Sequence, residues 1–385
     1  MTTTINNEHK KLNVPNLRFP EFQEEWEKTK IGDIAIVVGG GTPDTNTSQY
    51  WNGKIQWFTP SEIGRNKYVY NSVRTISEEG LNKSSAKLLP IGTILLSSRA
   101  TVGECSINKK ECTTNQGFQS LIPKENISNE FVYYLIQTKR KDLIRKSCGS
   151  TFLEISANEV RKIVVSIPSI KEQDKIAKLL SLLDDRIATQ NKIIEDLKKL
   201  KSAISKKLLC NDKWTTCIIQ DIAEIGRGRV ISSVEIDRQK HPLYPVYSSQ
   251  TSNNGIMGYL DNYMFDGEYI TWTTDGANAG TVFYRKGKFN CTNVCGTLKI
   301  LPKFDCYFVS LVLQQATQKY VSSNLANPKL MNNTMASIKI RMPNIETQKQ
   351  LSKVFKTLDS CLLVHQRTCK MYLSEKQYLL RQMFI

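Results

Sequence analysis

The chain has 385 residues, a formal net charge of +17 and a pI near 9.3. This length suggests two or three domains, and a hydrophobic content of 40% is typical of packed cores, which excludes a largely disordered chain. The excess of positive charge indicates a polyanionic partner, with nucleic acid favoured over an anionic membrane. The sequence has no apolar stretch long enough to cross a membrane, and residues 1–14 do not resemble a signal peptide, so we expect a cytoplasmic protein without a membrane partner.

The ten cysteines are scattered along the chain, and only three histidines accompany them. Neither of the two closest cysteine pairs, Cys105 with Cys112 and Cys291 with Cys295, has the C-x-x-C spacing of a zinc site. We therefore expect free and mostly buried thiols in a reducing compartment, and no metal ion in this chain.

The first globular region, residues 1–166 with an N-terminal leader, combines signals of strands and of helices. The stretch GTILLSSRATVGECSI, from Gly92, is typical of strands interrupted by glycine turns. The stretch FVYYLIQTKRKDLIRK, from Phe131, has helical spacing, with its apolar residues on one side and its Lys and Arg residues outside. The pattern predicts a mixed α and β domain with a sheet core.

Residues 167–210 are expected to form one long helix. Pro168 stands just before it, where a proline costs little, and the helix would extend about 60 Å. Since no ordinary globular helix needs that length, its apolar stripe requires a partner. Gln190 stands inside the stripe, where a polar residue usually fixes the register. The stripe has heptad-like spacing and comprises Ile176, Leu180, Leu183, Ile187, Ile194, Leu197, Ile204 and Leu208.

A second globular region and a second long helix follow, as residues 211–341 and 342–385. The second helix repeats the first at an offset of 175 residues, so that Asp359 corresponds to Asp184. His365 occupies the place of the polar residue inside the stripe, and we expect it to fix register rather than bind metal. We expect the two helices to bury their stripes against each other. The second stripe comprises Leu351, Phe355, Leu358, Leu362, Cys369, Tyr372, Leu379 and Met383.

The two globular regions repeat more faintly than the helices. Trp26 and Trp214 open similar runs, and residues 121–124 match residues 300–303. Between these landmarks the two regions differ strongly. Repeated landmarks with different residues between them are expected if two modules of one fold recognise different targets.

Motifs of catalysis on nucleic acids are missing from the sequence. No G-x-x-x-x-G-K-[ST] phosphate loop occurs, and the nearest approach to the Asn-Pro-Pro-aromatic turn of adenine methyltransferases is residues 327–330, Asn-Pro-Lys-Leu. Pro43-Asp44 is not followed by the acidic-x-Lys sequence of a metal-dependent nuclease core. Three histidines also leave little general-base machinery. None of these catalytic motifs is therefore visible in the sequence.

Polar, aromatic and basic residues gather in the turns of both modules. Arg suits guanine edges, Asn and Gln suit adenine, and Ser and Thr suit phosphates or either base. Trp57 and Trp272 could stack on bases, with core packing as an equal alternative, and each stretch taken alone is also compatible with an ordinary surface loop. In the first module the candidates for DNA contact are Thr42, Tyr50, Trp57, Thr59, Ser61, Arg65, Ser98, Arg99, Thr101, Asn115 and Gln116. In the second they are Arg227, Arg229, Tyr247, Ser248, Ser249, Gln250, Asn253, Asn254, Thr274, Asp275, Asn278 and Lys329.

The chain resembles the specificity subunit of type I restriction–modification systems over nearly its whole length. The resemblance rests on the order of two variable modules, each followed by a copy of one long helix. It rests also on short motifs at residues 14–26, 98–103, 167–173, 254–259 and 265–270.

This resemblance implies that each module is a target-recognition domain for one half of a split DNA sequence. The fold would be mixed α and β, an internal repeat with pseudo-two-fold symmetry in which the two helices pack as an antiparallel coiled coil and act as a spacer. Two methyltransferase subunits and two restriction subunits would dock on the chain and use S-adenosylmethionine, ATP and Mg²⁺, while this chain would hold no cofactor and no catalytic residue. Cys361, His365 and Cys369 make the second stripe less regular than the first. The alternatives are a stand-alone nucleic-acid-binding coiled-coil scaffold and a degenerate DNA methylase or nuclease.

Overall fold

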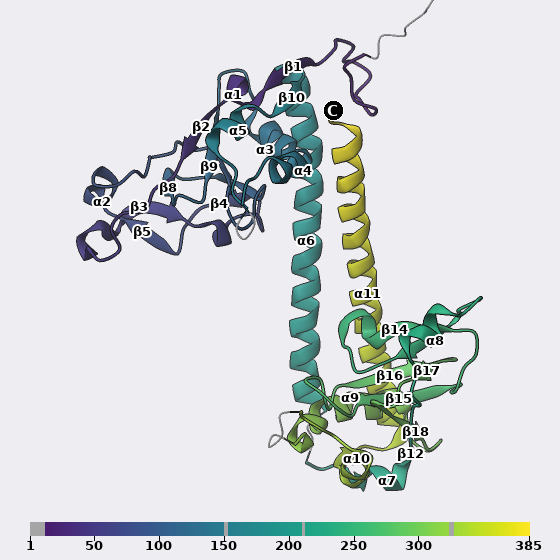
Figure 1. The fold of residues 1–385 in the computed structure, drawn as a ribbon. Coiled ribbons are helices and arrows are strands. Elements are labelled where there is room, and N and C mark those ends of the chain that lie inside the picture. The colour runs from purple at the N-terminus through teal and green to yellow at the C-terminus, as the bar shows by residue number, and fades with distance from the viewer. Residues whose placement is uncertain (1–11, 150–152, 210–211, 323–326) are drawn as a thin grey trace, which may run out of the picture. The chain divides into compact units, whose positions relative to one another are not determined.

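The computed structural model describes residues 12–149, 153–209, 212–322 and 327–385. Contacts divide the chain into unit 1, Met1–Gln190 with Thr368–Ile385, and unit 2, Asn191–Arg367. Each unit contains one globular module together with parts of both long helices (Figure 1). The mixed α and β fold with two similar sheet-containing modules is confirmed.

Module 1 is built on two small sheets and a two-stranded ribbon. The strand order of the larger sheet is β2 (Ala35–Gly39), β9 (Gln119–Pro123), β6 (Ile94–Leu96), β7 (Cys105–Asn108) and β4 (Tyr68–Val69). The smaller sheet comprises β5 (Arg74–Ile76), β3 (Trp51–Phe58) and β8 (Cys112–Thr114), and the ribbon pairs β1 (Glu27–Lys30) with β10 (Val164–Ile167). The helices are α1 (Ile31–Ile34), η1 (Ser48–Tyr50), η2 (Pro60–Glu62), α2 (Glu78–Asn82), α3 (Asn129–Thr138), α4 (Arg140–Arg145) and α5 (Ala157–Arg161).

Module 2 has the corresponding elements in unit 2. Its larger sheet has the order β12 (Ala223–Arg227), β18 (Cys295–Ile300), β15 (Glu268–Thr273) and β16 (Val282–Lys286). The smaller sheet comprises β14 (Ile256–Leu260), β13 (Tyr244–Tyr247) and β17 (Asn290–Cys291), and the ribbon pairs β11 (Thr215–Ile218) with β19 (Lys339–Met342). The helices are α7 (Ile219–Ile222), α8 (Ser233–Asp237), η3 (Ser252–Gly255), α9 (Cys306–Ala316), η4 (Thr317–Tyr320) and α10 (Asn332–Ser337).

The two modules share one topology. The order β2-β9-β6-β7 corresponds to β12-β18-β15-β16, and all of these neighbours pair antiparallel. In each smaller sheet one pair is parallel, β3 with β8 and β13 with β17. The expectation of two modules of one fold is therefore confirmed, with β4 as an extra edge strand in module 1.

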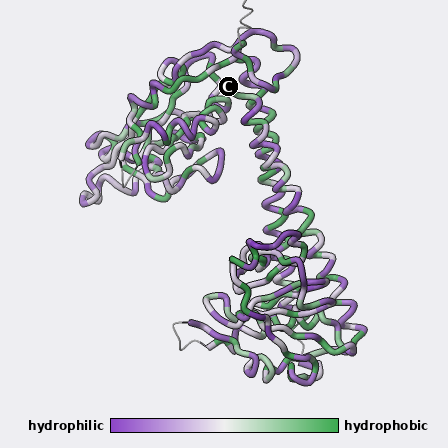
Figure 2. The backbone as a smooth tube through the Cα atoms, turned by 45° about the vertical axis from the view of Figure 1, so that its right-hand side comes forward, coloured by the Kyte–Doolittle hydropathy of each residue, from purple (hydrophilic) through white to green (hydrophobic). Residues whose placement is uncertain are grey.

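The long helices are α6, Ile170–Leu208, and α11, Ile345–Gln382, with 39 and 38 residues. Hydrophobic and hydrophilic residues alternate along them in Figure 2. In unit 1 the first half of α6 lies against the last part of α11, and in unit 2 the last part of α6 lies against the first half of α11 (Figure 1). The helices therefore run antiparallel in each unit, as expected.

The ends of both stripes also enter the cores of the modules, which the sequence did not indicate. In unit 1, Ile176 and Leu180 of α6 share one core with Leu379 of α11 and with residues of α3. In unit 2, Phe355 of α11 is fully buried among residues of α9 and β19. The expectation for Leu208 is wrong, because α6 ends at this residue and the chain turns, which leaves Leu208 36% exposed.

A glutamine in the first turn of each long helix joins the helix to its module. Gln173 Nε2 donates to the carbonyl of Pro168 at 2.9 Å, and Gln173 Oε1 accepts from the amide of Ser128 at 3.0 Å. Gln348 repeats both contacts in unit 2, with the carbonyl of Pro343 and the amide of Asp305. Both glutamines are 1% exposed. The repeated Pro and Gln residues therefore attach α6 to the start of α3, and α11 to the start of α9.

The segment before β1 is tied to both long helices within unit 1. Arg18 forms a bidentate ion pair with Glu172 of α6, at 2.7 and 2.8 Å, and the amide of Leu17 donates to the carbonyl of Gln382 in α11 at 2.9 Å. Trp26 is 2% exposed and packs edge-on against Phe131. Residues 17–26 are thus part of the packed structure of unit 1.

Six of the nine described cysteines are buried, as expected, and the free thiols among them include Cys105, Cys112, Cys291, Cys295 and Cys306. Burial raises the pKa of Cys105 and of Cys306 to about 12, so these thiols remain protonated at neutral pH. Among the residues that the structure describes, no helix combines the length and the apolar character that a membrane span requires.

Candidate nucleic-acid interface

In module 1, the turns that follow β2, β3 and β8 contain candidate residues and converge at one end of the sheets. The amide of Gly41 donates to the carbonyl of Thr114 at 2.8 Å, and the amide of Asn115 donates to the carbonyl of Phe58 at 3.0 Å. Thr42 Oγ1 donates to Gln116 Oε1 across two of these turns. A Cβ atom at Gly40 would lie only 2.0 Å from the carbonyl oxygen of Asn115, so a glycine is required for this approach.

Trp57 supports these turns from the inside. Its side chain is 4% exposed, and its Nε1 donates to the carbonyl of Gly41 at 2.9 Å. Its ring packs edge-on against Trp51, with 5.1 Å between the centroids. A ring held in this way contributes to the core and shapes the turn of residues 40–42, rather than presenting a face to a base. Trp272 is likewise fully buried.

The turn after β6 presents Arg99 at the surface. Ser98 is buried and its backbone joins two segments, because its amide donates to the carbonyl of Gly117 at 2.8 Å and its carbonyl accepts from the amide of Ile155 at 3.1 Å. Arg99 forms an ion pair with Glu154 at 2.8 Å, and Ala100 adopts a φ of +57°. The buried serine thus anchors a turn whose exposed side chain is a guanidinium.

The corresponding turn of module 2 carries Asp275 between two cations. Thr274 is fully buried, and its hydroxyl donates to Asp275 Oδ2 at 2.6 Å. Arg227 Nη2 lies 3.3 Å from the same oxygen, and Lys329 Nζ lies 3.8 Å from Asp275 Oδ1. Arg227 also donates to the carbonyl of Asn293. Four of the candidate residues are therefore brought together here.

The loop of residues 248–255 lies beside this cluster and is held by Arg285. Asn278 Nδ2 donates to the carbonyl of Ser249 at 3.3 Å, which joins the loop to the turn after β15. Asn253 and Asn254 adopt φ values of +47° and +53°. Arg285 is 3% exposed and donates to the carbonyl of Asn254 at 2.9 Å. Burial lowers the pKa of Arg285 to about 10.

Most of the other candidates are at least partly accessible. Tyr50 borders the buried pair Trp51 and Trp57, and Thr59 and Ser61 share a hydrogen bond at 3.1 Å. Arg229 pairs with Glu235. Further candidates are partly or fully exposed: Arg65, Thr101 in the turn after β6, Tyr247 at the end of β13, and Ser248 and Gln250 in the loop of residues 248–255. Contact of any of these residues with DNA stays a prediction.

Sequence reasoning missed two residues of the site, Glu154 and Arg285. Glu154 becomes the partner of Arg99 only when the chain returns beside the turn after β6, so no local signal exists. Arg285 has a weak signal, since it is a charged residue at an inward position of the strand β16.

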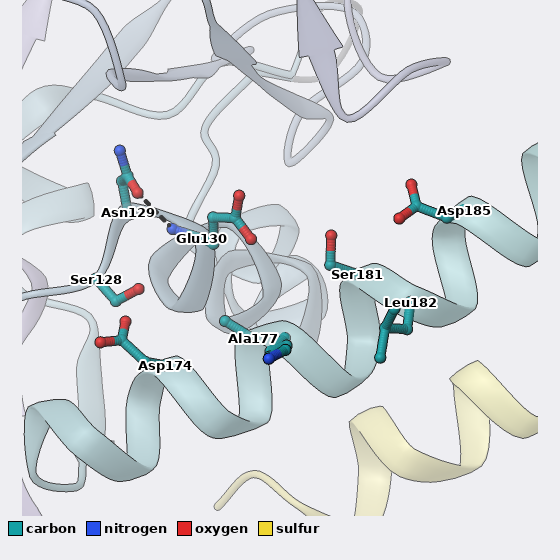
Figure 3. A pocket seen from close by; sticks show the side chains of 9 residues that line it. Ser128, Asn129, Glu130, Asp174, Ala177, Ser181, Leu182 and Asp185 are labelled. Carbon is teal, nitrogen blue, oxygen red and sulfur yellow. Dashed lines mark hydrogen bonds between the residues drawn. The ribbon is translucent and has the colours of Figure 1, made fainter.

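Beside the long helix of unit 1, a hollow has the wrong charge for DNA. Glu130 of α3 and Asp174 and Asp185 of α6 line it together with Lys178 (Figure 3). The equivalent hollow of unit 2 is lined by Asp305, Lys349, Lys353 and Lys356. These hollows occupy the same place in the repeat but carry opposite charge. The acidic one would repel phosphates and the basic one would attract them, so the two hollows do not form a phosphate-binding surface that is common to both units.

Among the residues that the structure describes, no group of three or more His, Cys, Asp or Glu side chains is arranged to hold a metal ion.

The model of the type I restriction modification DNA specificity domain matches residues 23–199 and again residues 211–370. The chain belongs to this family. The two matches coincide with two modules of one topology, each continued by a long helix.

Relatives in this family match about half of the chain. The specificity subunit of the type I restriction enzyme MjaIX from Methanocaldococcus jannaschii is 41% identical over 190 residues, which are 48% of this chain and 44% of that subunit. A putative type I specificity subunit of Mycoplasma pneumoniae is 38% identical over 196 residues, 50% of this chain and 82% of that protein. The first match therefore spans less than half of the relative.

The crystal structure of a type I restriction–modification S subunit from M. genitalium has the same fold. It aligns with a TM-score of 0.68 at 17% identity and covers 97% of this chain and 99% of that one. At this identity the likeness concerns the fold alone.

Proposed function

We propose that the chain is the DNA-recognition subunit of a type I restriction–modification complex, in which each module reads one half of a bipartite DNA sequence. The observation that carries the proposal is the doubled specificity domain, with one topology and two unlike sets of turn residues. Phosphate contacts from a chain of +17 supply affinity without sequence information. Base-edge contacts from the turn clusters supply discrimination.

The long helices suit the role of spacer. A continuous helix of 39 residues is about 58 Å long and is stiff compared with a loop linker. Binding one half-site makes binding of the second intramolecular, so a stiff spacer rejects half-sites at the wrong distance.

The helices also suit docking of partner subunits. On the last turns of α11, Met371 and Tyr378 are 70% and 57% exposed and lie seven residues apart, which places both on the same side of the helix. Large apolar side chains exposed along one helix are typical of protein–protein contacts. We propose that methyltransferase subunits, and then restriction subunits, dock on the chain, two of each.

In this proposal the chain is not catalytic. The methyltransferase subunits would bind S-adenosylmethionine and methylate adenine, and the restriction subunits would use ATP and Mg²⁺. The absence of the methyltransferase and phosphate-loop motifs from the sequence supports this division. The chain alone would bind duplex DNA and leave it unmodified.

The decisive experiment is a genome-wide map of methylated adenines in cells that carry the chain with its methyltransferase partner. We expect a split motif, two short sequences separated by a fixed gap. A continuous motif, or methylation that does not depend on this chain, would contradict the proposal. Incubation of the purified chain with S-adenosylmethionine, Mg²⁺ and DNA tests the alternative of a degenerate enzyme, since we expect no turnover. Competition between duplex DNA and RNA tests the alternative of an RNA-binding scaffold.

A further inference from the structure

Two ion pairs of opposite polarity occupy the same place in the two modules. In module 1 the residue after the buried Ser98 is Arg99, which pairs with Glu154. In module 2 the residue after the buried Thr274 is Asp275, which pairs with Lys329. The cation and the anion have thus exchanged positions between the modules.

Backbone contacts show that these places are equivalent. The carbonyl of Ser98 accepts from the amide of Ile155 at 3.1 Å, and the carbonyl of Thr274 accepts from the amide of Leu330 at 2.8 Å. Glu154 then forms an isolated bridge to Arg99, and Lys329 forms one to Asp275. The residue after Arg99 and the residue after Asp275 both have positive φ, +57° at Ala100 and +94° at Gly276.

The two side-chain pairs contribute little to holding these turns together. Arg99 and Glu154 are 45% and 42% exposed, and Lys329 and Asp275 are 41% and 22% exposed. Ion pairs with such exposure contribute little to folding stability because water screens them, and the backbone bonds join the same segments without them. The charged groups are therefore available to a ligand.

The available atoms differ in kind between the modules. Arg99 presents several N–H donors, which match the O6 and N7 acceptors of guanine in the major groove. In Asp275 the hydrogen bonds from Thr274 and Arg227 go to Oδ2, and among the described residues only Lys329 approaches Oδ1, at 3.8 Å. That oxygen can accept a hydrogen bond from an exocyclic amino group, as on cytosine or adenine. The two flanking cations offset the repulsion between this carboxylate and DNA phosphates.

We infer that Arg99 and Asp275 are specificity determinants that recognise complementary kinds of hydrogen-bonding group. Arg99 reads a base that presents acceptors, such as guanine, and Asp275 reads a base that presents a donor, such as the amino group of cytosine or adenine. This inference rests on the proposed function. Glu154 orients the guanidinium of Arg99 before DNA binds and competes with the base for it.

The test uses the full chain in complex with its methyltransferase partner and a library of duplex DNA randomised at both half-sites. R99K keeps the positive charge but loses the bidentate geometry. We expect discrimination at one base pair of the first half-site to fall roughly 10-fold, with the second half-site unchanged. D275N should relax one base pair of the second half-site alone. Equal weakening on all sequences would mean that these residues contact phosphates, and would overturn the inference.

E154Q serves as the second variant if R99K fails to fold. Because the competing carboxylate is removed, we expect the same base to be selected with severalfold tighter binding. Unchanged affinity, or a different base, would contradict the inference. If the unmodified complex selects no sequence at all, the proposed function itself has failed. If it selects a split sequence that R99K and D275N read with full discrimination, only the present inference fails.

Discussion

The ammonium group of Lys376 lies 2.6 Å from a carboxylate oxygen of Asp184, and Lys201 and Asp359 form the same pair in unit 2. Each Asp also accepts a hydrogen bond from a module tyrosine, Tyr134 at 2.6 Å and Tyr307 at 2.5 Å. Each long helix therefore supplies the acid of one pair and the base of the other. Because the helices repeat at an offset of 175 residues and run antiparallel, the same Lys–Asp pair forms twice, once in each unit. In each unit a tyrosine of the module joins the pair.

Asp184→Asn should destabilise unit 1 by about 1–3 kcal/mol, because the Lys376 ammonium would lose its counter-charge in a site where both side chains are largely buried. Denaturant unfolding of the full chain would measure the change. The matched control is Glu195→Gln, which removes a pair whose members are about 70% exposed and should change stability by less than about 0.5 kcal/mol. Equal effects of both variants would contradict the structural role of Asp184.

Gln173→Ala and Gln348→Ala should each detach the start of a long helix from its module. Each substitution leaves a partly buried backbone amide and a carbonyl without their partner, at a cost of about 1–3 kcal/mol. Hydrogen exchange at Ser128 and Asp305 would report the loss locally. Gln350→Ala, at an exposed position of α11, is the control and should leave both amides protected.

Arg285→Met should loosen the loop of residues 248–255, since the carbonyl of Asn254 and the hydroxyl of Thr271 would lose the guanidinium. We expect faster hydrogen exchange in this loop and weaker discrimination at the second half-site, with the first half-site unchanged. The exposed Arg238→Met in the same module is the charge-matched control. A loss of affinity that is equal in both variants would point to net charge alone.

Glu130 should make the stability of unit 1 depend on acid pH. Burial by itself would raise its pKa, but hydrogen bonds from Tyr68 and Lys67 outweigh burial and hold the pKa below the ordinary value of 4.5. A depressed folded-state pKa contributes stability that is complete above the unfolded value and is lost as the pH falls through the folded one. The free energy of unfolding should therefore fall between neutral pH and a pH below 4.5, and this fall should be smaller in Glu130→Gln than in the unmodified chain. Glu125→Gln, at an exposed position, should leave the difference unchanged.

Insertion of one helical turn after both Gln190 and His365 should lengthen the preferred gap between the half-sites. Four added residues extend a helix by about 6 Å, which corresponds to about two base pairs at a spacing near 3.4 Å. Sequencing of methylated sites measures the gap. Insertion into one helix alone is the control, because it shifts the two stripes out of register and should lower stability instead. An unchanged gap in a folded double insertion would refute the spacer role.

Much of the fold was predictable because local patterns carry it. The stripe from Ile176 to Ile204 and Pro168 before it are local signals, and the structure forms the long helix that they predict. The strands predicted from Gly92 onward, interrupted by glycine turns, are β6 and β7. The candidate site was less predictable, since the composition of a turn does not show which side chains are accessible.

The sequence alone determined that this chain has two modules of one frame, two matching helices and a basic surface, because periodicity, repeats and net charge depend only on the order and type of the residues. Only the tertiary structure decided that Trp57, a candidate for stacking on a base, is buried under the turn of residues 40–42, that Arg99 meets Glu154, and that Lys329 and Asp275 reverse this pair in the second module. These relations join residues far apart in the chain, and hydrogen bonding and burial assign their partners only after the sheets have formed.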